Sequence, residues 1–546
     1  MHLRALAFFI SAVIALPSST PAAAAYSWAH SYGDDATQTL TSVATDQSGN
    51  VLVCGTFYGS MTFNTSMTSA GSIFPDIFIA KLGPGGNAIW NHRIGVSNND
   101  EGFDIAADKD NNVIVVGATT DTFGNTRILI AKYNAAGTQL FQKTYGESGG
   151  ASRYAQFVSA DLAGNIIVTG KFGYQIDFGG GPIFAPGFDD EAMFLAKLDT
   201  NGNHIWSKAF KWGVSTGLGG LETDATAQIV LHGHFQDSID FGAGPITSAG
   251  LTDLFLVKFT PDGRVRWNRK YGSANADASV CLAVTPDGRC AIAENLYSAV
   301  DFGGGLLTPT GLPQPAVALF TTNGTHVWSK TFTATTNAFA YGMTIAENKD
   351  VVLTVHGTGS INFGGGPVAA TGTAYNEFVA RFNESTGLHR WSFAFGGDGN
   401  VYGFPAVAHG KIVVAGYMDG AANPGGGALP YEGETDVFVT SFGETLTGVG
   451  TSSMMANLYQ NVPNPFNPTT SIPYMLEAPA HVKIGIYDVS GSRIAVLNEG
   501  KQTPGIHAAI WNGRDQSGRA VPSGVYFYRF ESMPDVTASR KMVLLK

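Results

Sequence analysis

Acidic side chains in variable loops are the residues best suited to catalysis in this sequence. Asp34 and Asp35 form one pair, and Asp100 and Glu101 form a second pair in the equivalent loop one repeat later. Two carboxylates that face each other can cleave a glycosidic bond, because one protonates the leaving oxygen while the other acts as base or nucleophile. A surface hydrolase or lyase acting on polysaccharide or peptide through these loops is therefore one function hypothesis.

Two further groups have spacings that metal sites use. His232 and His234 alternate along one predicted strand and face the same side, but a metal site needs at least one more ligand. The run from Asp108 to Asn112 has acidic spacing similar to a calcium loop, without the glycine and the distant glutamate. We interpret the first pair as hydrogen-bonded strand histidines and the run as a tight turn, and we predict no metal.

Glycine-rich loops recur four times, as DFGGGP, DFGAGP, DFGGG and NFGGGP, beginning at Asp177, Asp240, Asp301 and Asn362. Phosphate loops need a Lys-Ser/Thr pair and a following helix, which these segments lack. We interpret them as tight connections in which Asp or Asn stabilises the turn, and we predict no cofactor and no catalytic constellation.

The three cysteines are Cys54, Cys281 and Cys290. Cys281 and Cys290 flank a predicted hairpin turn whose register would pair Cys290 with Thr285 and leave Cys281 near Glu294. A disulfide needs Cβ atoms about 4 Å apart, so we interpret the cysteines as buried free thiols.

The elements that must position these residues follow a repeat. Seven rows are anchored by an aromatic residue, and the six later anchors have glycine four residues before them. The predicted blade-packing anchors are Trp28, Trp90, Phe141, Trp206, Trp267, Trp328 and Trp391. Of these, we expect Trp90, Trp206, Trp267, Trp328 and Trp391 to be buried in equivalent positions. Each row carries four short β-rich segments separated by Gly, Asn and Asp turns, which is the content of a propeller blade.

The ends of the repeat predict how the ring closes. The chain enters the repeat at an outer strand, residues 26–32, and its last complete strand is a third strand at 436–442. The final blade therefore lacks its own outer strand, which the N-terminal segment can supply, and this removes two exposed sheet edges. The sequence predicts an all-β fold: a seven-bladed β-propeller over residues 26–442, followed by an Ig-like β-sandwich.

The rows resemble the repeats of secreted bacterial β-propeller proteins (SBBP/NHL-like repeats), over roughly residues 26–442. In that family the tryptophan packs between blades. The segment ending at Trp391 also resembles the tryptophan-docking repeat of quinoprotein dehydrogenases, but the quinone-site residues cannot be placed. The segment around Asp262 resembles the Asp-box of sialidases without its one-residue spacer, and we interpret it as structural.

Residues 443–456 are rich in Gly, Ser and Thr and are predicted to be a linker. Residues 457–546 begin with a proline-rich segment, which excludes a helix, and continue as alternating strands typical of an Ig-like sandwich.

This last region resembles the type A sorting domain of the type IX secretion system, a relative of the FlgD-like Ig fold. The resemblance implies transport across the outer membrane and attachment at the surface; whether the domain is then removed stays open, as does a purely structural Ig module. The matching residues include Pro463, Asn464, Pro465, Phe466, Asn467, Pro468, Trp511, Gly513, Asp515, Gly518, Gly524, Tyr526 and Lys546.

Residues 1–25 have the pattern of a signal peptide: Arg4, a short apolar run and an A-x-A site with predicted cleavage after Ala25. We expect export to the outer-membrane surface or the extracellular space, without a transmembrane segment. The net charge of −11 disfavours nucleic acid as a partner. Secretion machinery and an unknown extracellular glycan or protein remain as predicted partners.

The rows differ most in the loops that join one blade to the next, whereas the turns predicted on the opposite face repeat almost unchanged. Variable loops can be matched to a ligand, and repeated turns indicate scaffold. The second function hypothesis, which we prefer, is a non-catalytic surface binding or adhesion protein that uses the variable face.

Overall fold

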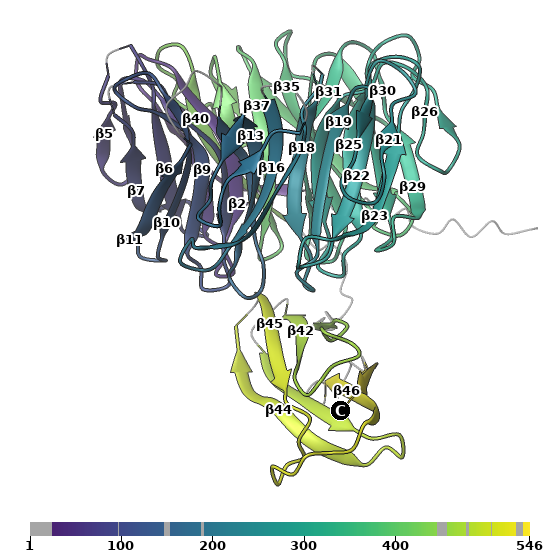
Figure 1. Cartoon of the computed structure of the whole chain (residues 1–546). Coiled ribbons are helices and arrows are strands. Elements are labelled where there is room, and N and C mark those ends of the chain that lie inside the picture. Colours follow the sequence, from purple (N-terminus) through teal and green to yellow (C-terminus); the bar gives the residue numbers. More distant parts are fainter. Residues whose placement is uncertain are drawn as a thin grey trace, which may run out of the picture.

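The protein is all-β in its computed structural model (Figure 1). The structure describes residues 24–71, 73–96, 98–146, 153–186, 191–213, 215–444, 456–476, 480–503, 505–530 and 539–545. The predicted signal peptide up to residue 23 and most of the predicted linker lie outside these residues, as does Lys546.

Seven antiparallel blades form the first domain within the described residues, each with an inner, second, third and outer strand. In that order they are β2 (Gln38–Thr45), β3 (Val51–Phe57), β6 (Asp76–Leu82), β7 (Ala88–Ile94); β8 (Asp100–Ala107), β9 (Val113–Thr120), β10 (Thr126–Tyr133), β11 (Gln139–Tyr145); β12 (Tyr154–Ala160), β13 (Ile166–Gly173), β16 (Glu191–Leu198), β17 (His204–Lys211); β18 (Gly217–Thr223), β19 (Ile229–Phe235), β22 (Asp253–Phe259), β23 (Val265–Tyr271); β24 (Ser279–Val284), β25 (Cys290–Leu296), β28 (Gln314–Phe320), β29 (His326–Thr331); β31 (Ala338–Ile345), β32 (Val351–Gly357), β35 (Asn376–Phe382), β36 (His389–Gly397); and β37 (Val401–Ala408), β38 (Lys411–Met418), β40 (Asp436–Glu444), β1 (Ala24–Tyr32).

The inner strands form a closed ring. Each of β2, β8, β12, β18, β24, β31 and β37 contacts the next in this order, and β37 contacts β2. The connections between blades lie on one face, which we call the upper face, and the turns from inner to second strand lie on the lower face. The ring surrounds a central channel, and apolar residues of neighbouring blades pack against one another in shared clusters.

The N-terminal strand closes the ring as predicted. β1 pairs antiparallel with β40, with Tyr26 opposite Phe442 and Tyr32 opposite Val437, and the same sheet contains β38 and β37. The strand begins at Ala24, two residues earlier than expected. One blade is therefore built from both ends of the propeller sequence.

The anchor tryptophans join each blade to the next. The indole N–H of Trp267 donates to the carbonyl of Thr322 in the following blade at 3.0 Å, and a Cβ added to Gly324 would lie 3.1 Å from the same indole. Gly324 also has a φ of 73°, which favours glycine. Trp28, Trp90, Trp206 and Trp328 donate in the same way. Trp90, Trp267, Trp328 and Trp391 are buried, whereas Trp206, which the sequence analysis also expected to be buried, is half-buried like Trp28 and Phe141.

Buried ion pairs inside the blades were not expected from the sequence. A lysine near the end of the third strand binds the aspartate that opens the inner turn, as in Lys258–Asp224 at 2.8 Å with both side chains at most 2% exposed. Equivalent pairs are Lys81–Asp46, Lys132–Asp108 and Lys197–Asp161, while Arg381 pairs with Asp350 at the other end of its turn. In the blade of β24, Thr285 and Leu319 occupy these two positions, so that both charges are absent together.

The prediction that the glycine-rich loops are tight connections is only partly right. Asp177, Asp240, Asp301 and Asn362 do accept hydrogen bonds from glycine N–H groups in their turns. The loops are not confined to tight turns on the upper face, however. They form small hairpins, such as β14 (Gln175–Ile176) with β15 (Ile183–Phe184), that lie against the outer strand, with Gly180 next to His204. The phenylalanine after each Asp or Asn, such as Phe178, is buried there.

The expected pairing of the cysteines is also wrong by one position. Cys290 lies opposite Val284 and Cys281 opposite Ala293. The turn hydrogen bond from Thr285 N to Arg289 O sets this register, and a β-bulge beyond Cys281 shifts only the next pair, Ser279 with Glu294. All three cysteines are free thiols; Cys54 and Cys290 are buried as expected, whereas Cys281 is half-buried.

The second domain is a β-sandwich, shown below the propeller in Figure 1. One sheet contains β41 (Ala456–Leu458), β42 (Thr470–Leu476) and β45 (Gly505–Trp511), and the other contains β43 (Ala480–Tyr487), β44 (Arg493–Gln502), β46 (Gly524–Phe530) and β47 (Ser539–Leu544). The two sheets share one apolar core. Tyr459, at the start of this domain, is buried against Ala225 and Leu162 of the lower propeller face.

Candidate functional site

The central channel holds a cavity of about 780 Å³. Residues from all seven inner strands line it, so no single blade forms the site. The size lies within the range of about 300–1,000 Å³ that is typical of small-molecule sites. The channel is therefore the best candidate for a ligand-binding site in the described residues.

A repeated β-bulge shapes the channel wall. Six of the inner strands carry a bulge near the same level, for example between Gly102 and Asp104, whereas β37 pairs with β38 without one. The pairing of each inner strand with its second strand then shows which residues lie at the same height in the channel. One level contains Ser42, Asp104, Phe157, Cys281 and Phe404, because each of them pairs with the same repeat position of its second strand. Glu222 lies one level lower, with Ala44, Ala106, Ser159 and Thr344.

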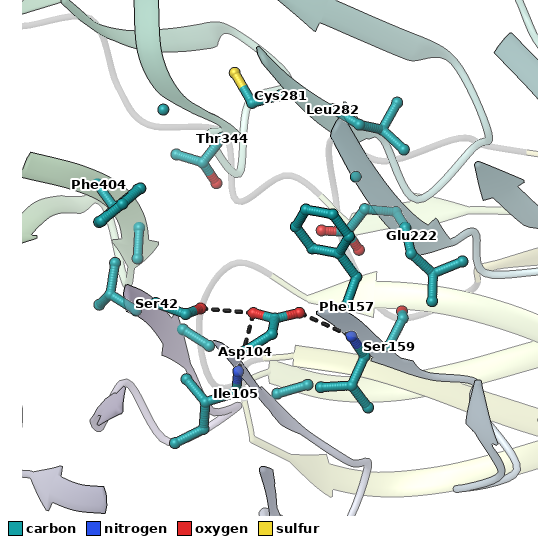
Figure 2. A pocket seen from close by; sticks show the side chains of 18 of the residues that line it. Ser42, Asp104, Ile105, Phe157, Ser159, Glu222, Cys281, Leu282, Thr344 and Phe404 are labelled. Atoms are coloured by element: carbon teal, nitrogen blue, oxygen red, sulfur yellow. Dashed lines mark hydrogen bonds between the residues drawn. The ribbon is translucent and has the colours of Figure 1, made fainter. Parts of the chain in front are cut away.

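Asp104 is held firmly at the upper of these two levels. Its carboxylate accepts hydrogen bonds from Ser42 Oγ at 2.6 Å, from its neighbour Ile105 N at 2.9 Å and from Val158 N at 2.8 Å (Figure 2). These donors come from three different blades. Burial raises the pKa of Asp104 to about 6, although the hydrogen bonds oppose this shift.

Glu222 is the second carboxylate of the channel. Its side chain is exposed and belongs to the cavity lining, and Figure 2 shows it projecting into the same cavity as Asp104. Its carboxylate contacts the backbone N–H of Thr223. Desolvation, followed by the charge of Asp104, raises the pKa of Glu222 to about 8.

Aromatic side chains surround the two acids. Phe103, Phe157, Tyr341, Phe404 and Tyr417 line the channel, and the rings of Tyr341 and Phe404 lie 4.8 Å apart.

A stack of rings extends this aromatic wall toward the upper face. Tyr417 stacks on Tyr402 at 4.7 Å, Tyr402 on His356 at 4.1 Å, and His356 on Tyr375 at 4.2 Å. The channel therefore combines carboxylates with flat apolar surfaces, which is the composition of a binding site for a partly apolar ligand.

The acids that the sequence analysis singled out lie elsewhere. Asp34 accepts from Ala36 N, Gln38 Nε2 and Ser60 N and joins loops of the upper face, and Asp35 is exposed. Asp100 is fully buried and accepts from Val96 N and Thr120 N, and burial raises its pKa to about 6. Glu101 accepts from Asn99. None of the four lines the cavity.

The two strand histidines have hydrogen-bond partners, as their interpretation required. His232 is buried and binds Phe255 O through Nδ1 and Glu294 Oε1 through Nε2, at 2.8 and 2.6 Å. His234 Nδ1 lies 3.0 Å from Ser279 Oγ. No group of three potential metal-binding side chains occurs in the described part of the chain.

Burial, and then the charge of Glu294, raise the pKa of the Cys281 thiol.

The predicted sorting-motif residues build the β-sandwich. Phe466, Trp511 and Tyr526 are buried together, and the backbone of Phe466 is hydrogen-bonded to the last strand through Val543 and Leu545.

Other motif residues form the surrounding turns and surface. Asp515 caps its turn by accepting from Ser517 N and Arg519 N, and Gly513 and Gly518 have positive φ. Pro463, Asn464, Pro465, Asn467 and Pro468 are exposed, Asn464 Oδ1 accepts from Val543 N, and Gly524 begins β46. Lys546 lies outside the described residues.

Sequence reasoning missed Asp104 and Glu222. Each is the only acid at its level of the ring, so neither is part of a repeat or a local pair. The only signal in the sequence was their position: both acids lie in inner strands, at repeat positions where the other blades have small or apolar residues.

A comparison with known protein families gives a match in the second domain. Residues 466–534 match the family of FlgD Ig-like domains, which covers the second domain only. A comparison with curated proteins found no match. No helix in the described residues is long and apolar enough to cross a bilayer.

Solved structures similar to the chain include propeller proteins at very low identity. The Pan2 WD40 domain of Neurospora crassa is 9% identical, with 75% of this chain and 95% of that chain covered and a TM-score of 0.40. The quinohemoprotein alcohol dehydrogenase ADHIIG of Pseudomonas putida HK5 is 8% identical, with 78% and 77% covered and a TM-score of 0.38. BamB of Moraxella catarrhalis is 13% identical, with 75% and 85% covered and a TM-score of 0.31. The propeller assignment itself follows from the strand pairing described above.

Proposed function

We propose that this protein is an exported binding protein of the bacterial cell surface whose propeller captures an extracellular ligand in the central channel. The observation that carries the proposal is the cavity of about 780 Å³, whose lining includes Asp104, Glu222 and five aromatic rings drawn from several blades. A site assembled from all blades is rigid, which favours recognition because little ordering is needed on binding.

We further propose that the second domain directs the chain across the outer membrane through a type IX secretion system and retains it at the surface. The match to FlgD Ig-like domains and the motif residues from Pro463 to Tyr526 support this role. The proposed signal peptide, with cleavage after Ala25, would first bring the chain to the periplasm.

Localisation is tested by deletion and grafting in a host that has this secretion system. Deleting residues 457–546 should leave a folded propeller in the periplasm, and grafting residues 451–546 onto a periplasmic reporter should carry the reporter to the surface. The ungrafted reporter is the control. If the truncated protein reached the surface while the graft stayed inside, the domain would have a structural or binding role instead.

Ligand binding is tested with the mature chain on arrays of glycans and peptides. A ligand of the channel should lose affinity when Glu222 is changed to Gln, and should keep it in the matched variant Glu101→Gln, whose side chain lies on the inner strand of the same blade as Asp104 but outside the cavity. Equal affinity in all three proteins would place the binding site elsewhere.

A hydrolase or lyase is the second candidate function. The observation in its favour is that Asp104 and Glu222 share one cavity and that their pKa values are raised to different extents, to about 6 and about 8. Such a difference is what an acid and a base need. Turnover of a polysaccharide or peptide that is lost in both Asp104→Asn and Glu222→Gln would establish the enzyme, whereas binding without turnover across a hydrolase panel would exclude it for those substrates.

A further inference from the structure

Charge compensation differs sharply between the channel and the blades around it. The buried aspartates of the inner turns each face a lysine or arginine, as in Asp224–Lys258 and Asp108–Lys132, both at 2.8 Å. Asp104 and Glu222 have no such partner among the described residues, and the cavity lining there contains no lysine, arginine or histidine. The channel thus holds two acids that nothing in the described chain neutralises.

We propose that the channel binds a small organic cation, a primary ammonium or guanidinium group, between Asp104 and Glu222. This inference rests on the proposed binding function and names the class of its ligand. Asp104 is fixed by Ser42, Ile105 and Val158, so its carboxylate is already oriented toward the cavity without rearrangement. Glu222, whose carboxylate contacts a single donor among the described residues, the Thr223 N–H, can turn to meet a ligand.

The aromatic lining suits the same class of ligand. A cation within about 6 Å of an aromatic ring face is attracted by the ring quadrupole, and the attraction grows where water is excluded. Phe157 lies at the level of Asp104, and Phe404 lies on the other side of the cavity from Phe157 (Figure 2). Tyr341 also lines the cavity and packs against Phe404. Aliphatic parts of an amine ligand would pack on these rings while its charge binds the carboxylates.

The protonation of Glu222 gives this binding mode a measurable signature. The titratable groups that line the cavity with it are Asp104, Cys281, Tyr341 and Tyr417, and Asp224 is neutralised by Lys258. Because the pKa of Glu222 is raised to about 8, the free protein near pH 7 holds a proton there. A bound cation favours the ionised carboxylate. Binding of a ligand that keeps its own charge over this range, such as the arginine guanidinium, should therefore release a proton and become tighter as the pH rises from 6 to 9.

The test is isothermal titration calorimetry on the mature full-length chain with lysine, arginine, glucosamine and spermidine, each in two buffers of different ionisation enthalpy. At least one cation should bind and release up to one proton near pH 7. Glu222→Gln should weaken that binding about tenfold or more and abolish the proton release. Glu101→Gln should change neither. Near-UV circular dichroism checks the fold of each variant, and Glu222→Gln is the principal one because Asp104 also holds three donors in place.

The outcomes separate this inference from the function on which it rests. If neutral or anionic ligands bound in the channel while all four cations failed, the charge argument would be wrong and the binding function would stand. If Ca²⁺ bound between the acids and the organic cations did not, the ligand class would be wrong. If no array ligand bound at all, both proposals would fail.

Discussion

The buried pair Lys258–Asp224 can be tested by comparison with a neighbouring blade that lacks the pair. Asp224 accepts hydrogen bonds from Thr226 N and Gln228 N in its turn and from Lys258 Nζ at 2.8 Å, and Lys258 also donates to Gly288 O of the next blade. In the next blade, the two positions are Thr285 and Leu319. The double change Asp224→Thr with Lys258→Leu therefore copies an arrangement that the fold already contains.

The expected energies follow from the burial of the pair. Lys258→Leu alone leaves a carboxylate with 2% exposure and no cation, and removal of one partner of a buried pair costs about 3–5 kcal/mol. Asp224→Thr alone strands the lysine at a similar cost. In the double variant neither charge is left, and threonine can keep the turn bond, as Thr285 does by accepting from Arg289 N at 2.9 Å. We expect the double variant to lose only about 1–2 kcal/mol.

The measurement is urea unfolding of the mature chain, followed by tryptophan fluorescence, for the two single variants and the double variant. The coupling energy of the cycle should be several kcal/mol, since contacting residues do not add. The exposed pair Lys109–Asp110 should give a coupling energy below about 1 kcal/mol in the same cycle. If the double variant lost as much unfolding free energy as the two single variants together, the two residues would not act as a pair that can be replaced as a whole.

Three further outcomes are expected. Trp267→Ala should cost about 3–5 kcal/mol in the same unfolding assay, and more than Trp206→Ala, because only the first indole is buried; a loss below about 1 kcal/mol would contradict that burial. Deleting residues 26–32 should leave the edge of β40 unpaired and cause self-association in sedimentation velocity, whereas a monodisperse monomer would argue against closure by this strand. Burial raises the pKa of Glu294 to about 7 although His232 opposes the shift, so its contribution to stability is complete below pH 4.5 and is lost as the pH rises toward 7. Glu294→Gln should therefore flatten the dependence of the melting temperature on pH in that window, and an unchanged dependence would contradict the assignment.

The propeller could be predicted because its anchors repeat. The spacing of Trp90, Trp206 and Trp267 defines the rows, and the unpaired outer strand at 26–32 gives the closure that β1 and β40 show. The glycine before each anchor has a local physical reason, since it packs on the aromatic anchor ring of the preceding blade.

The interior of the ring could not be predicted in the same way. The bulged positions of the inner strands, such as Thr41, Phe103 and Gly219, share no residue type, so the bulge leaves no pattern in the sequence. The lysine–aspartate pairs did leave a pattern, but a lysine in a strand is normally exposed, and only the packing of the third strand against the inner turn shows that it is buried. Asp104 and Glu222 come together only through ring closure.

The pairing of β1 with β40 also sets the order in which the chain can complete its fold. Thr440 Oγ1 donates to the carbonyl of Trp28 across 412 positions of sequence. The strand β1 therefore cannot pair until β40, the last strand of the propeller, has been synthesised. Until then the blades form an open arc with two unsatisfied edges. Contacts this distant form slowly, because a long loop must close before they are gained. A chain built in this way cannot lock into its final shape blade by blade, because the ring becomes complete only when its last blade has formed.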